Sequence, residues 1–73
     1  MLSFYQKQKL NEKRNDAWLA MNRHLEEIKG LEKRIQADPN TTAINNDFRE
    51  EIKTHRDDIK RLQKEIDTIE AQL

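Results

Sequence analysis

Several residue types on which other folds depend are absent from the sequence or rare in it. It contains no cysteine and no valine, and it has one glycine and one proline. Without cysteine there is no disulfide framework, no zinc knuckle and no thiol nucleophile. At 73 residues the chain is one domain at most, which excludes a sheet-based enzyme with a cofactor cleft. We therefore expect no enzymatic activity, no metal site and no cofactor.

Charge and hydropathy exclude further classes. The 14 basic residues balance the 14 acidic ones, and zero net charge argues against a general nucleic-acid binder. No apolar run approaches the ~18–20 residues of a transmembrane helix. No signal-peptide pattern follows the first residues. We expect no membrane association, and a location in the cytoplasm or within a larger assembly such as a virion.

Helix-favouring residues dominate the chain, with one strong break. Glu, Lys, Arg, Gln, Leu and Ala are frequent, and all favour helix. Residues 38–42 read Asp-Pro-Asn-Thr-Thr, which is turn chemistry. The sequence predicts a single all-α domain over 1–73, with a helix at about 3–37, a turn at about 38–42 and a helix at about 43–73.

Local signals suggest where each helix begins. Ser3 and Gln6 fit a capping box at the start of the first helix. Asp47 and Glu50 could form a second box at the start of the other helix. Alternatively, Asp38 is the N-cap, with the proline after it at the first helical position. The start of the second helix therefore stays open between these two positions.

Apolar residues recur at helical spacing in both segments. The second helix has a strict heptad pattern, typical of a coiled coil, at Phe48, Ile52, His55, Ile59, Leu62, Ile66, Ile69 and Leu73. The first helix has a looser stripe at Leu10, Ala17, Trp18, Met21, Leu25, Ile28, Leu31 and Ile35. The short break between them predicts an antiparallel two-helix hairpin with coiled-coil packing.

A turn near residue 40 sets the expected register of the hairpin. It places Ile28 opposite Ile52 and Leu25 opposite His55, with Met21 opposite Ile59 and Trp18 opposite Leu62 one and two turns further on. The residues expected to pack within the hairpin or on self-association are Trp18, Met21, Leu25, Ile28, Ile52, His55, Ile59, Leu62, Ile66 and Ile69.

Apolar residues outside this stripe predict further contacts. Leu19 and Leu31 cannot face the same helix as the main stripe, so we expect a second copy to cover them in a four-helix bundle. Alternatively, the second helix forms a parallel coiled coil, because Ile at a and Leu at d favour two parallel strands. The candidate contacts for a protein partner are Leu2, Phe4, Tyr5, Leu19 and Leu31.

The N-terminal third is mildly basic. Residues 1–24 carry five basic and two acidic side chains, a net charge of +3. A nucleic-acid contact would use Lys7, Lys9, Lys13 and Arg14. The alternative interpretation is an ordinary solvated helix whose charge complements the acidic C-terminal helix.

His55 is the one polar residue in the d row of the second helix. We interpret it as a polar core residue that fixes register or oligomeric state. If it is desolvated as a neutral imidazole, the hairpin should lose stability as the pH falls. A pH switch or a metal ligand, with His24 nearby, is the alternative, but no His-Glu-x-x-His spacing supports a metal.

These observations favour a small non-catalytic protein–protein interaction or assembly protein. It would be a structural subunit of a larger particle, or a small regulator or inhibitor that binds another protein. A nucleic-acid-binding hairpin dimer that uses the basic N-terminal helix is the alternative. Chains of this style are common among small phage and plasmid proteins. We expect self-association and a second protein as a further partner.

Overall fold

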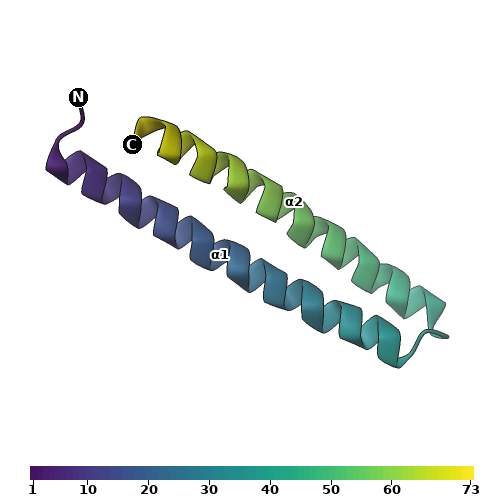
Figure 1. Cartoon of the computed structure of the whole chain (residues 1–73). Coiled ribbons are helices and arrows are strands. Elements are labelled where there is room, and N and C mark those ends of the chain that lie inside the picture. The colour runs from purple at the N-terminus through teal and green to yellow at the C-terminus, as the bar shows by residue number, and fades with distance from the viewer.

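The computed structural model describes residues 1–73 as two antiparallel helices joined by a short turn (Figure 1). Helix α1 spans Phe4–Ala37 and helix α2 spans Thr42–Gln72. The molecule is a rod of 57 × 14 × 11 Å, with both termini at one end. The predicted all-α hairpin is therefore confirmed. Neither helix has an apolar stretch long enough to cross a membrane.

The predicted capping box at the start of α1 is present. The Ser3 hydroxyl oxygen accepts a hydrogen bond from the Gln6 backbone N–H at 3.1 Å. The Gln6 side-chain oxygen accepts one from the Ser3 backbone N–H at 2.9 Å. Two backbone N–H groups that a helix start leaves without partners are thereby satisfied.

The turn differs from both sequence-based alternatives for the start of α2. The helix begins at Thr42 after the N-cap Thr41, so Asp47 lies inside it and caps nothing. Asp38 is not the N-cap either, because it is the C-cap of α1. The Thr41 hydroxyl donates to the Asp38 carboxylate at 2.6 Å, and the Asn45 side-chain amide donates to the Asp38 carbonyl at 2.8 Å. These two bonds tie the start of α2 to the end of α1.

The helices share one seam, which contains two apolar clusters. The cluster near the termini consists of Ala17, Met21 and Ile66, with Ile59 and Leu62 against it. The cluster near the turn consists of Ile28, Leu31 and Ile52, with Ile35, Phe48 and Ile59 against it. Ile59 contacts both clusters and links them. The clusters place Ile28 with Ile52 and Met21 with Ile59, as the predicted register requires.

Two expected pairings in α1 are wrong by one residue. His24, and not Leu25, faces His55, while Leu25 is 43% exposed. Trp18 is 44% exposed, and the buried residue beside it is Ala17. Neighbouring residues on a helix point about 100° apart, so a shift of one position moves a side chain from the seam to its flank.

The expectation for Leu31 is also wrong. Leu31 is only 6% exposed, so the hairpin itself covers it and it is not available to a partner. It lies in the seam because α1 follows a strict alternation of four-residue and three-residue steps. The buried and half-buried residues with this spacing are Leu10, Arg14, Ala17, Met21, His24, Ile28, Leu31 and Ile35.

Replacing Ile66 tests the seam. Ile66 is the most deeply buried large side chain, at 1% exposure. We expect Ile66→Ala to lower the free energy of unfolding by about 2–4 kcal/mol, because it leaves a cavity in the core. Ile44, on the same helix and 51% exposed, provides the matched control. Chemical denaturation of Ile66→Ala and Ile44→Ala checks this, and equal losses would contradict the seam.

Replacing Asn45 tests the turn. Asn45 is 2% exposed, and its amide donates to the Asp38 carbonyl. We expect Asn45→Ala to destabilise the protein by about 0.5–1.5 kcal/mol, since the hydrogen bond to the Asp38 carbonyl is lost. Its exposed neighbour Asn46 is the control, because Asn46→Ala makes the same change in helix propensity. Thermal melts that show no difference between the two variants would contradict this role.

Candidate interaction surface

Three large apolar side chains in the middle of α1 remain exposed outside the seam. Trp18 and Leu25 are about half-exposed, and Leu19 is 64% exposed. Trp18 and Leu25 are seven residues apart, which places them on the same side of α1 about two turns from each other. We call this pair the Trp18 stripe. Leu19 follows Trp18 directly and therefore points away from the stripe.

The Trp18 stripe lies on the flank of the hairpin between α1 and one side of α2. Met21, between the two stripe residues in sequence, is buried in the seam beside them. Glu32 continues the seven-residue spacing after Leu25, and its carboxylate lies 3.6 Å from the Arg56 guanidinium of α2. This cross-helix ion pair lies at one end of the stripe. Asn11, seven residues before Trp18, lies at the other end.

The N-terminal apolar residues separate into two environments. Leu2 is half-buried and lines a shallow depression with Tyr5, Leu10 and Gln72, where α1 begins and α2 ends. Phe4 is 84% exposed and Tyr5 is also exposed. Phe4 and Tyr5 are therefore free to contact another molecule without a rearrangement of the end of the hairpin.

The basic residues of the N-terminal third do not share one face. Lys7 and Arg14 are seven residues apart and occupy one side of α1, whereas Lys9 and Lys13 occupy another. The Lys9 ammonium lies 3.6 Å from the Glu12 carboxylate and 5.5 Å from the centre of the Tyr5 ring. Arg14 is half-buried. It donates to the side-chain oxygen of the neighbouring Asn11 at 2.9 Å.

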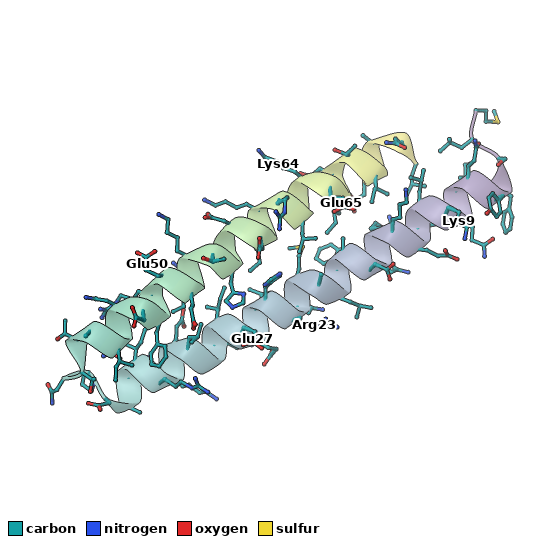
Figure 2. All side chains as sticks on the ribbon, turned by 180° about the vertical axis from the view of Figure 1, so that it is seen from behind. Lys9, Arg23, Glu27, Glu50, Lys64 and Glu65 are labelled. Atoms are coloured by element: carbon teal, nitrogen blue, oxygen red, sulfur yellow. The ribbon has the colours of Figure 1, made fainter.

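The charged residues elsewhere point outwards along both helices. Figure 2 shows Glu50 and Lys64 on the outer side of α2, directed away from α1. Pairs such as Glu26 and Lys29, 3.5 Å apart, lie within one helix on its exposed surface. Exposed pairs of this kind contribute about 0.2–0.5 kcal/mol each. The carboxylates are spread along the rod and do not converge on a shared site.

A pair of histidines occupies the seam between the two apolar clusters. The Nδ1 atoms of His24 and His55 lie 2.8 Å apart, within hydrogen-bond distance, and the ring centres are 5.0 Å apart. The Asp58 carboxylate lies 3.8 Å from His24 Nε2 and accepts a hydrogen bond from Arg61 at 2.6 Å. No group of three or more potential metal ligands converges anywhere in the chain.

Sequence reasoning identified His55 in the seam but not His24 opposite it. His24 is polar and stands beside Leu25, so a search for apolar residues selects Leu25 instead. The signal that identifies His24 is spacing: it lies three residues after Met21 and four before Ile28, where a heptad places a seam residue.

Comparison of the chain with protein-family models, with curated proteins and with solved structures found no match.

Proposed function

We propose that this is a small non-catalytic interaction protein that assembles with a second copy of itself through the Trp18 stripe. The supporting observation is the exposure of Trp18 and Leu25 on the same flank of α1, about two turns apart. Tryptophan is among the residues most enriched where protein interfaces derive their affinity. A hairpin in which each helix has one neighbour can cover this stripe only with another chain.

The position of the stripe favours an antiparallel dimer. The midpoint between Trp18 and Leu25 falls near residue 21, and the midpoint of α1 falls near residue 20. A two-fold axis through this point would place Trp18 of each copy against Leu25 of the other, with the rods overlapping along their full length. Two-fold symmetry makes the same patch complementary to itself, as closed dimers require. Two hairpins joined in this way form a four-helix bundle.

The distribution of charge also favours antiparallel association. The half of the rod near the termini, residues 1–20 and 60–73, has seven basic and five acidic side chains, a net charge of +2. The half near the turn, residues 21–59, has seven basic and nine acidic side chains, a net charge of −2. An antiparallel dimer brings the positive half of each copy beside the negative half of the other.

A larger assembly would use the apolar residues that such a dimer leaves exposed. Phe4 and Tyr5 project near the termini, and Ile44 is exposed near the turn. These ends of the rod are where a second protein would bind if the hairpin acts as a subunit of a particle or as a regulator of another protein. The protein would then be found in the cytoplasm or within a particle such as a virion.

Analytical ultracentrifugation tests self-association directly. At tens of micromolar, we expect a mass near twice the 8.8 kDa of one chain. The double variant Trp18→Glu/Leu25→Glu should be monomeric, because the dimer would bury unpaired carboxylates. Its helicity by circular dichroism should be retained, since neither residue is in the seam.

The matched control for this experiment is Ile44→Glu, an exposed apolar residue on the other helix. It adds one carboxylate outside the stripe, where the double variant adds two within it, so this variant should remain dimeric. A native protein that sediments as a monomer, or a double variant that still dimerises, would contradict the proposal.

The nucleic-acid alternative depends on the positive charge of residues 1–24 and is separable from self-association. If Lys7, Lys9, Lys13 and Arg14 bind phosphates, fluorescence anisotropy with labelled RNA or DNA should show an affinity that falls steeply with salt. Changing all four to Gln should then abolish binding. Because these residues lie on two sides of α1, we expect no salt-dependent binding at physiological ionic strength. A clear salt slope that the fourfold variant removes would reverse this preference.

A further inference from the structure

His24 and His55 together form one polar layer of the seam, which we call the histidine layer. The two imidazoles face each other from opposite helices at the same level of the seam, and their Nδ1 atoms are 2.8 Å apart. We propose that this layer holds one added proton but not two, and that the hairpin therefore loosens as the pH falls through the range in which histidine titrates.

In the neutral pair, each imidazole ring carries one hydrogen, and its position is set by the groups around the ring. A neutral imidazole has one N–H donor and one bare nitrogen acceptor. The Asp58 carboxylate can only accept, and it faces His24 Nε2 at 3.8 Å, so the hydrogen of His24 belongs on Nε2. His24 Nδ1 is then the acceptor in the pair. His55 must donate through its Nδ1–H and has a bare Nε2.

The first added proton is compatible with this arrangement. It binds His55 Nε2, the free acceptor, and leaves the Nδ1–H of His55 donating to His24. The hydrogen bond becomes charge-assisted, which strengthens it. The charged groups one helical turn from the two rings are Glu27 on α1 and Glu51 and Asp58 on α2, and all three are carboxylates. They favour a single positive charge on the layer.

The second proton is not compatible with it. The remaining site is His24 Nδ1, and protonating it leaves two N–H donors facing each other with no acceptor. It also places two positive rings in contact, with Arg61 already paired to Asp58 on the same flank. Separation of the rings would relieve this conflict. Because the layer lies between the two apolar clusters, their separation would disturb packing on both sides.

The sign of the pH effect follows from counting protons. In acid the unfolded chain binds a proton on each histidine, whereas the folded hairpin accommodates one. Stability falls with decreasing pH wherever the unfolded state binds more protons than the folded state. The fall begins near the reference histidine value of about 6.5, because below it the two histidines of the unfolded chain together bind more than the one proton that the folded layer holds. This range lies above the values of about 4 at which carboxylates titrate.

Thermal melting at one chain concentration between about pH 8 and pH 5 provides the test, since this range brackets histidine titration. We expect the Tm of the native protein to fall by about 5–10 °C over this range. A shift of this size is typical for a small domain that loses one stabilising contact, here the contact between the two imidazole rings. The variant His24→Leu/His55→Leu replaces the layer with apolar side chains. Its Tm should be higher and should change little with pH. An equal fall in Tm for both proteins would overturn the proposal.

Asp58→Asn and nuclear magnetic resonance distinguish this layer from a merely structural contact. Without the Asp58 charge, the singly protonated layer loses support, so the fall in Tm on acidification should be larger. At pH 8, imidazole ¹⁵N shifts should show the hydrogen on Nε2 of His24 and on Nδ1 of His55. Identical tautomers on the two rings, or two independent titrations without any fall in Tm, would also overturn the proposal.

Discussion

A two-helix hairpin has only one seam, and the other properties of this molecule depend on that constraint. Each helix meets a single neighbour, so only the side chains that point along the line between them can be buried. Eight of 73 residues are buried, and seven of these are apolar side chains in that line. The hydrophobic contribution to stability, about 25 cal/mol per Å² of apolar surface buried, is therefore concentrated in a few layers. A polar layer within such a seam has a large effect because few apolar layers are present to offset it.

The sequence predicted the seam of α2 more completely than the seam of α1, and the reason is physical. In α2, apolarity and heptad spacing select the same residues from Phe48 to Ile69, with His55 as the one exception. In α1 the two criteria disagree, because Ala17 and His24 occupy seam positions while the more apolar Trp18 and Leu25 stand next to them. Spacing is the stronger guide, since a helix packed against a strict heptad must match its 3.5-residue repeat along the whole seam.

The two helix starts show the limits of local signals in a similar way. The capping box of Ser3 and Gln6 is a contact between residues three apart, so the sequence alone predicts it. The start of α2 depends instead on the bond from Asn45 to the Asp38 carbonyl, which joins the two helices across the turn. Asn45 has no capping signature of its own. Its buried position is set by the packing of the hairpin, which local propensity does not contain.

The places where α1 departs from the best possible hairpin are also the places where function can be sought. A chain selected only for the stability of its seam would put the larger apolar side chain inward at each level. Here alanine and histidine face inward, while Trp18 and Leu25 face outward. Natural sequences break local rules of this kind mainly at functional or strained sites. We propose the outward pair as a surface for assembly and the inward histidines as a layer that responds to protons. The inward His24 and the outward Trp18 and Leu25 lie within the same two turns of α1. Separation of the rings in the seam would therefore also move the helix face on which a second copy would pack.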